Sequence, residues 1–320
     1  MNAMVFFVTL FTQNRGGGGG TPNLRIVLAV ALAACATISC DKLGLGSDGN
    51  PTGPDPVPPP SAGATVIYAA MGASDALGFG SSVPCFPFVD CVDGTGYVQV
   101  AARRLRTQGF SVTLSNLGLP TAVIGRDFEL LGRQYDRQIL GNFIDQQLPL
   151  VRQDTTLVTI FAGGNEVNTI TAALGGGAGA GNPAAYIDQQ VAAFGADYAT
   201  LLQGVRGRAG GARIVALNVP NVAAMPFLAG VPLVQRQAAQ RAAVGMTAVV
   251  NALLTAQAVT VIDLMCDERS YRTSNYSSDG FHPNDSGYAF IAAEVVLSAT
   301  NVAYPPPRDN CPQMSVVPPP

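Results

Sequence analysis

Residues 65–75 have the sequence TVIYAAMGASD, in which the run Thr65–Met71 leads directly into Gly72, Ala73 and Ser74. An apolar run of this length that stops at a glycine predicts a buried β-strand. The strand would present Ser74 in a glycine-flanked turn at its carboxyl end. Sites in parallel α/β sheets lie outside the carboxyl ends of the strands, so this serine is the first candidate functional residue.

The chain after Met71 alternates strand-type runs with segments of helical periodicity. This alternation predicts a parallel sheet with helices on both of its faces. We therefore expect one α/β domain over residues 64–303, in which Gly118 and Asn165, like Ser74, follow strands at the same edge. The expected strands are 65–71, 110–116, 155–162, 212–217 and 259–264, and the expected helices are 97–108, 142–151, 184–208, 233–256 and 285–299.

The single histidine of the chain, His282, lies in the segment DGFHPND at 279–285. Histidine is the side chain best suited to take up and return a proton near neutral pH. With Ser74 as nucleophile and Asp279 as the carboxylate that orients the ring, the chain contains a complete catalytic set. The alternative is structural, with Ser74 and His282 capping or packing against helices. Asp263 and Asp285 are rival partners for His282, although Asp285 fits better as the cap of the last helix.

Four blocks of sequence, in order, resemble the SGNH hydrolases, also called GDSL esterases and lipases. They match the nucleophile block, the oxyanion glycine, the GxND block and the DxxH block of that family across nearly all of residues 65–300. The resemblance implies a three-layer α/β/α sandwich with a central parallel five-stranded sheet of flavodoxin-like type. The blocks are GASDALG at 72–78, NLG at 116–118, GGNE at 163–166 and DGFHP at 279–283.

The resemblance also implies an oxyanion hole. Negative charge that develops on the ester carbonyl oxygen needs donors placed in advance. The backbone N–H groups of Ser74 and Gly118 and the side-chain amide of Asn165 would supply them. The structural alternatives are a plain turn glycine at 118 and a capping or turn role for Asn165.

Two positions depart from the family pattern. Ala73 stands in place of the aspartate of the GDS triplet, and Glu166 in place of the aspartate of GxND. Neither position belongs to the family's catalytic set, so we expect the chemistry to survive. The missing carboxylate at position 73 is expected to loosen the hydrogen bonding around the serine turn.

The amino-acid composition bears on the partners, metals and cofactors that the chain can bind. Charged residues make up 12% of the 320 residues, the net charge is −3, and Lys42 is the only lysine. Because no basic surface can form, we expect no nucleic-acid partner. The expected mechanism uses no metal and no cofactor. A zinc site is the competing interpretation of the cysteines, but they lack CxxC spacing and His282 is assigned elsewhere.

The N-terminal region is typical of an exported lipoprotein. Arg25 precedes the apolar run 26–34, which is too short to span a bilayer. The run ends in LAAC at 32–35, which resembles the bacterial lipobox and makes Cys35 the expected lipidation site. Cys40 is a weaker second candidate, and a simply cleaved signal is the alternative. We therefore expect a signal peptide at 1–34, a lipid-anchored Pro/Gly-rich linker at 35–63, and a location in the cell envelope, facing the periplasm or the surface.

Export permits disulfides. Four cysteines remain outside the lipobox region, and they allow three pairings. We favour Cys85 with Cys91 and Cys266 with Cys311, because these pairs are the most local. The second pair would fasten the Pro-rich tail at 304–320.

A glycine-rich stretch lies within residues 169–183 and directly follows the Asn165 block. Ordering glycine is costly in conformational entropy, so one expectation is a mobile flap or rim over the site. A surface insertion without function is the alternative.

Taken together, the sequence predicts an exported serine esterase that forms an acyl-enzyme intermediate. Its substrate would be an acylated carbohydrate, a lipid ester or a small ester, and the sequence does not choose among them. The alternative from a different class is a catalytically silent binding lipoprotein with the same fold. The intact set of Ser74, Asp279, His282, Gly118 and Asn165 argues against it.

Overall fold

The computed structural model describes residues 57–89, 91–255 and 257–319. The chain divides into the units Met1–Asn50 and Pro51–Pro320, and all described residues belong to the second. The predicted signal peptide, Cys35, Cys40 and most of the predicted linker lie outside the described residues.

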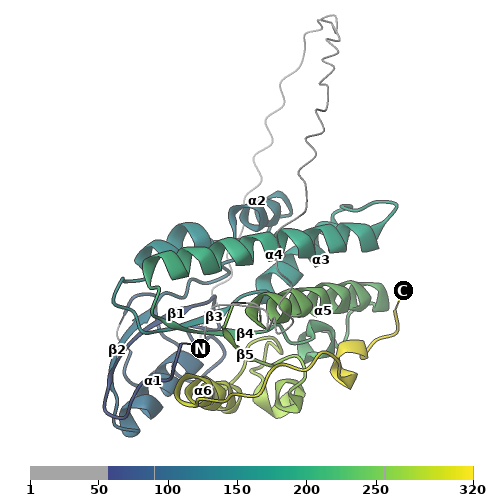
Figure 1. Ribbon diagram of the computed structural model, residues 1–320. Helices are drawn as coiled ribbons and strands as arrows, with labels where there is room; N and C mark the ends of the chain where they lie inside the picture. Colours follow the sequence, from purple (N-terminus) through teal and green to yellow (C-terminus); the bar gives the residue numbers. More distant parts are fainter. Residues whose placement is uncertain (1–56, 90, 256, 320) are drawn as a thin grey trace, which may run out of the picture. The chain divides into compact units, whose positions relative to one another are not determined.

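A five-stranded parallel sheet in the order β2-β1-β3-β4-β5 forms the centre of this unit (Figure 1). The predicted α/β class is confirmed. The chain runs outward from β1 in both directions, so the boundary between β1 and β3 is a topological switch point, where α/β proteins bind ligands. The strands are β1 Thr65–Met71, β2 Ser111–Asn116, β3 Leu157–Phe161, β4 Arg213–Leu217 and β5 Thr260–Ile262.

Helices cover both faces of the sheet (Figure 1). One face packs against α1 and α6, and the other against α2, α3, α4 and α5. Side chains of β1 alternate between the two cores, as the two-residue period of a strand requires: Tyr68 belongs to one and Met71 to the other. The helices are α1 Tyr97–Thr107, α2 Arg126–Gln134, α3 Gly164–Gly175, α4 Pro183–Arg208, α5 Leu233–Thr255 and α6 Asp285–Thr300.

The helix predicted at 142–151 is wrong. The structure has a π-helical turn, η1 (Phe143–Gln147), followed by a 3-10 turn, η2 (Leu148–Leu150). Pro149 explains the difference, because a proline inside a helix removes one hydrogen bond and its ring clashes with the preceding turn. These two turns also place the apolar side chains that suggested a helix, such as Phe143, against the core.

The predicted flap over the site is also wrong. Residues 164–175 form α3, which begins at the carboxyl end of β3 and is 12 residues long. At about 1.5 Å per residue it carries the chain about 18 Å away from the sheet edge. The glycine-rich stretch is therefore reduced to the connection at 176–182 before α4, and none of residues 169–183 lines the cavity described below.

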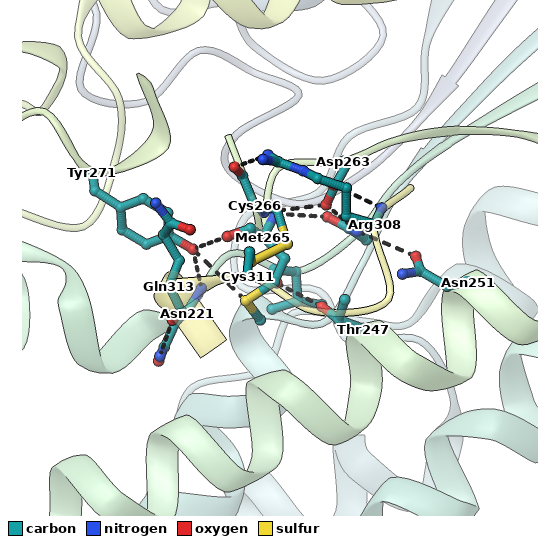
Figure 2. The surroundings of a disulfide bond; sticks show 12 residues. Asn221, Thr247, Asn251, Asp263, Met265, Cys266, Tyr271, Arg308, Cys311 and Gln313 are labelled. Atoms are coloured by element: carbon teal, nitrogen blue, oxygen red, sulfur yellow. Dashed lines mark hydrogen bonds and ion pairs between the residues drawn. A yellow bond between two sulfur atoms is a disulfide. The ribbon is translucent and has the colours of Figure 1, made fainter. Parts of the chain in front are cut away.

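The C-terminal segment packs onto the domain instead of forming a loose tail. Both expected disulfides, Cys85–Cys91 and Cys266–Cys311, are present. Beyond Cys311, the carbonyl of Gln313 accepts a hydrogen bond from Asn221 (2.8 Å) (Figure 2). Val317, which is 2% exposed, exchanges backbone hydrogen bonds with the side chain of Gln240 in α5.

The remaining short turns connect these elements on the sheet's carboxyl side and in the C-terminal segment. They are η3 Val222–Ala224, η4 Pro226–Leu228, η5 Glu268–Tyr271, η6 Thr273–Asn275 and η7 Pro312–Ser315. Within the described part of the chain, no helix has both the length and the apolar character needed to cross a bilayer.

Candidate active site

Three residues predicted to act together are joined by hydrogen bonds. The hydroxyl oxygen of Ser74, in the turn after β1, lies 2.8 Å from Nε2 of His282, although 208 positions separate them in the chain. Nδ1 of His282 lies 2.6 Å from Oδ2 of Asp279. The fold thus brings the strand end and the loop before α6 to one place at the carboxyl edge of the sheet.

The surroundings of Asp279 keep it ionised. Burial alone would raise the pKa of this carboxyl, but hydrogen bonds from His282, Phe281 and Ser277 outweigh burial and lower the pKa to about 2. An ionised carboxylate can only accept hydrogen bonds. The proton between the two residues therefore resides on Nδ1 of His282, which leaves Nε2 as the acceptor for the Ser74 hydroxyl.

The serine turn is fixed by a side chain that sequence reasoning missed. Gln147, at the end of η1, accepts from the N–H of Gly72 (3.1 Å) and donates to its carbonyl oxygen (2.8 Å). Gln147 is fully buried. The sequence carries no signal for this contact, because it joins positions 75 residues apart and depends on the π-helical turn.

The carboxylate missing at position 73 is replaced by that of the next-but-one residue. Asp75 accepts a hydrogen bond from the N–H of Ala73 (3.0 Å). The expected loosening of the serine turn is therefore wrong, because Asp75 and Gln147 both hold it. The adjacent Ser-Asp pair was visible in the sequence and could have suggested a local carboxylate cap of this kind.

Asp75 is a partly buried acid whose pKa is raised. Its second carboxyl oxygen has no hydrogen-bond partner among the described residues. Burial raises the pKa of Asp75 from its usual 3.8 to about 6, partly offset by backbone hydrogen bonds and by the nearby His282. The charge of Asp75 in turn adds to the effect of burial in raising the pKa values of Tyr97 and Tyr288.

The two residues expected to complete the oxyanion hole flank the serine turn. A Cβ at Gly118 would lie 2.9 Å from the Cβ of Ala76 and 3.1 Å from the carbonyl oxygen of Ala73, so only glycine fits here. The N–H of Gly118 is engaged by Oδ1 of Asn116 (3.1 Å), a residue of the same block that sequence reasoning did not single out. Asn116 also donates to the carbonyl of Ala76 (2.8 Å), and thereby ties this loop to the serine turn.

Asn165 lies in the first turn of α3 and shares a cavity with Ser74 and His282. One N–H of its amide is donated to the carbonyl oxygen of Ala122 (3.0 Å), which orients the side chain. An amide nitrogen has two N–H groups, so the second can serve a ligand. Gly163, just before the helix, has a φ of +117°, and a Cβ there would lie 2.2 Å from Val219, which explains the glycine in this block.

Glu166, the second departure from the family pattern, supports the start of α3. Its two carboxyl oxygens accept from the N–H groups of Gly163 (2.8 Å) and Ile124. Burial is the main influence and raises the pKa of Glu166 to about 7, while these hydrogen bonds and Arg137 act in the opposite direction. The longer side chain thus joins the block after β3 to the loop before α2.

The rival partners of His282 are bound elsewhere. Asp263 accepts a hydrogen bond from the N–H of Cys266 (3.1 Å) and pairs with Arg308 (Figure 2). It also accepts a hydrogen bond from Asn218 (3.0 Å). The expectation that Asp285 caps the last helix is wrong. Asn284 accepts from the N–H groups of Ser286 and Gly287 and is the cap, whereas Asp285 accepts from the N–H and hydroxyl of Ser82.

A cavity of about 820 Å³, counting the open space at its mouth, adjoins Ser74. Ser74, Asp75, Asn165, Glu166 and His282 contribute to its wall, together with mainly apolar side chains. Gly118 is not part of the wall. Among the described residues, no three His, Cys, Asp or Glu side chains are grouped closely enough to hold a metal ion.

A parallel α/β sandwich that holds a hydrogen-bonded serine, histidine and aspartate beside a cavity defines a serine hydrolase. Residues 70–290 match the sequence profile of the GDSL-like lipase/acylhydrolase family, and the chain belongs to this family. The chain is therefore an enzyme, a serine hydrolase that acts on ester bonds. The alternative of a silent binding protein is not supported.

Solved structures agree with this fold. A lipase from a goat rumen metagenome is similar with a TM-score of 0.50 and 17% identity, over 73% of this chain and 97% of that chain. Phospholipase A1 from Streptomyces albidoflavus NA297 is similar with a TM-score of 0.50 and 18% identity, over 75% of this chain and 100% of that chain. At such identities the likeness concerns the fold. No curated protein matches the chain significantly in sequence.

Proposed function

We propose that the enzyme hydrolyses carboxylic esters through Ser74, His282 and Asp279, with a covalent acyl-enzyme intermediate. The observation that carries the proposal is the continuous chain of hydrogen bonds at 2.8 Å and 2.6 Å from the serine hydroxyl through the imidazole to the carboxylate. A serine hydroxyl is a weak nucleophile until a base removes its proton during attack. His282 is the only histidine of the chain.

In the first half of the reaction, Oγ of Ser74 attacks the ester carbonyl carbon while its proton moves to Nε2 of His282. The imidazolium is stabilised by the Asp279 carboxylate. When the tetrahedral intermediate collapses, the bond from carbon to the alcohol oxygen breaks and His282 returns the proton to the departing alcohol. The acyl group then remains bound to Ser74.

In the second half, a water molecule takes the place of the alcohol. His282 removes one proton from the water as its oxygen attacks the acyl carbon. Collapse of the second intermediate breaks the bond to Oγ of Ser74 and returns the proton to that oxygen. The products are a carboxylic acid and the original enzyme.

The developing negative charge requires fixed donors. We assign this role to the N–H groups of Ser74 and Gly118 and to the free N–H of the Asn165 amide. The N–H of Gly118 already donates to Oδ1 of Asn116, so its use requires that this hydrogen bond be shared with, or exchanged for, the substrate oxygen. Such donors act mainly on the transition state.

The test uses a fluorophosphonate probe, which phosphonylates an activated serine. Ser74 is the expected site of the adduct, and Ser74→Ala should abolish both labelling and hydrolysis of p-nitrophenyl acetate. Labelling of Ser81, Ser82 or Ser278 in the unsubstituted protein would contradict the assignment. Substitution of Ser278, which is exposed and adjacent to Asp279, by alanine serves as the matched control and should leave labelling of Ser74 intact.

We further propose that the enzyme is exported and anchored to a membrane of the cell envelope through a lipid on Cys35. The support lies in the sequence, with the short apolar run 26–34 before LAAC and the Pro-rich stretch after it. Bacterial lipoproteins carry more than one acyl chain, as stable anchoring requires. The stretch after Cys35 has too few apolar residues to form a core.

Fractionation of bacterial cells that express the full chain tests the anchor. The protein should be found with the membranes, Cys35→Ser should release it, and Cys40→Ser should not. The opposite pattern would move the anchor to Cys40. Release of the unsubstituted protein into the soluble fraction would remove the anchor altogether.

A further inference from the structure

The cavity beside Ser74 extends well beyond the catalytic residues. Its wall includes the last residue of β3, residues just after β4 and β5, the first turns of α6, and several residues between 269 and 283. We propose that this cavity binds the acyl chain of the substrate, and that the enzyme acts on esters of apolar carboxylic acids several carbons long. This inference rests on the proposed function of Ser74.

The wall of the cavity is strongly apolar. Val219, Met225, Leu264 and Ile291 are each at most 7% exposed. Each methylene group that enters such a wall leaves water, which favours binding. The other apolar residues of the wall include Phe143, Phe161, Val222, Phe281 and Phe290.

The charged side chains of the wall are already engaged within the protein. Arg269 is paired with Asp267 (2.5 Å) and Glu294 (2.7 Å), and its guanidinium lies over the ring of Phe290. Asp75 and Glu166 accept backbone hydrogen bonds, as described above. Few polar atoms of the wall are left to bind a ligand, chiefly the second carboxyl oxygen of Asp75 and one N–H of Asn165. A sugar or another polyhydroxy group would therefore lose most of its hydrogen bonds to water without replacement, which is unfavourable.

The acyl side of the ester fits the cavity better than the alcohol side. An acyl chain ends in a methyl group and needs no hydrogen bonds along its length, so it can be surrounded by the apolar side chains of the wall. A polar alcohol keeps its hydrogen bonds only if it remains at the open mouth.

Chain-length dependence provides the first test. For p-nitrophenyl esters of straight-chain acids from two to sixteen carbons, used below micelle-forming concentrations, the leaving group is constant. We expect kcat/KM to rise at least about tenfold from acetate to hexanoate, since one fully buried methylene is worth about fourfold in an equilibrium. It should then level off or fall when the chain exceeds the cavity. A flat profile, or acetate as the best substrate, would overturn the inference.

Two isomeric esters distinguish the acyl side from the alcohol side. Methyl heptanoate and hexyl acetate have the same composition, but the apolar chain lies on opposite sides of the ester bond. We expect methyl heptanoate to be hydrolysed at least about tenfold faster, for the reason given for the chain-length series. Faster hydrolysis of hexyl acetate would show that the cavity takes the alcohol.

A substitution in the wall provides the second test. Met225→Phe should narrow the cavity and lower the ratio of kcat/KM for the octanoate ester to that for the acetate ester at least about fivefold. Met246→Phe is the matched control, because Met246 is buried in α5 and is not part of the wall. It should leave the ratio unchanged. Because both esters are measured on one preparation, partial loss of folded enzyme cancels in the ratio.

These outcomes separate the acyl-site inference from the function on which it rests. If no ester is hydrolysed and the fluorophosphonate does not label Ser74, both the proposed function and the acyl-site inference are wrong. Hydrolysis with labelled Ser74 but no preference for longer chains overturns the acyl site alone. An equal change of the ratio in Met225→Phe and Met246→Phe would also overturn it.

Discussion

Single residues around Ser74 determine where its hydroxyl lies. Gln147 and Asp75 fix the backbone of the turn, and Nε2 of His282, the proposed base, lies within hydrogen-bond distance of the hydroxyl. The side chains of Gln147 and Asp75 both form hydrogen bonds with backbone groups of the turn. The turn is therefore ordered before any substrate arrives, which spares the reaction the cost of ordering it.

The first prediction concerns Asn165. Asn165→Ala removes the amide expected to donate to the oxyanion, and we expect kcat to fall about 10²–10³-fold with little change in KM for p-nitrophenyl acetate. The measurement is steady-state kinetics. Asn182→Ala, which removes an exposed capping amide before α4, is the control and should have no effect on kcat. A large rise in KM with unchanged kcat would make Asn165 a substrate-binding residue instead.

The second prediction concerns the pH dependence of stability at Asp75. Its pKa rises from 3.8 to about 6 on folding, so the native state binds the proton more tightly than the unfolded chain. Asp75 therefore favours the native state at low pH, and this contribution is lost as the pH rises from about 4 through about 6. In the Asp75→Asn variant the side chain does not titrate, and its amide oxygen can still accept a hydrogen bond from the N–H of Ala73.

We thus expect the stability of Asp75→Asn, relative to the unsubstituted protein, to increase by roughly 2–3 kcal/mol between pH 4 and pH 7. Urea denaturation at a series of pH values measures it. Asp93→Asn provides a comparison at an exposed carboxyl. A difference that is constant over this range would show that Asp75 has an ordinary pKa in the folded protein.

At the level of secondary-structure elements, the site depends on how α3 begins. The helix starts immediately after β3, and Glu166 binds the N–H groups of Gly163 and Ile124. Asn165 is in the same turn, so this arrangement also fixes the direction of its amide. The neighbouring η1 turn has a comparable effect on Gly72 through Gln147.

The third prediction follows for Glu166. Glu166→Ala leaves two buried N–H groups without an acceptor, and we expect the free energy of unfolding to fall by about 2–6 kcal/mol, since each such group costs about 1–3 kcal/mol. Urea denaturation measures the change. Glu268→Ala, at an exposed glutamate, should change stability by less than about 0.5 kcal/mol. Equal stability of the two variants would show that the hydrogen bonds of Glu166 contribute little.

At the level of the whole molecule, the C-terminal segment is tied back to the loop after β5. The Cys266–Cys311 disulfide and the Asn221–Gln313 hydrogen bond hold it there (Figure 2). The buried Val317 adds a further contact. The loop after β5 leads through η5 and η6 to Asp279 and His282. The tail therefore supports the side of the molecule that carries His282, the proposed catalytic base.

The fourth prediction compares the two disulfides. Cys266–Cys311 spans 45 residues and Cys85–Cys91 spans 6. From loop-closure entropy, we expect removal of the long-range bond to cost about 4 kcal/mol and removal of the short-range bond about 2 kcal/mol. Double Cys→Ser variants, unfolded by urea without reductant, measure both. A larger loss for the Cys85–Cys91 pair would contradict the entropic account.

The sequence by itself determined the class of fold and the identity of the catalytic candidates. Apolar runs such as Thr65–Met71 could be recognised as strands because the pattern of apolar residues that marks a buried strand is present in the local sequence. His282 was identifiable because the chain has no second histidine. Asp279 was identifiable because it precedes His282 by three residues, so that a single turn brings its carboxylate to the imidazole. These are properties of composition and of local geometry.

Only the tertiary structure decided what surrounds these residues. Three sets of hydrogen bonds depend on the packing of the elements that carry them. They join Gln147 to Gly72, Glu166 to Ile124, and Asn116 to Gly118. The raised pKa of Asp75 and the apolar cavity arise from burial by several elements at once. No local pattern encodes such contacts, because burial and long-range hydrogen bonds are created when strands and helices from the whole chain pack together.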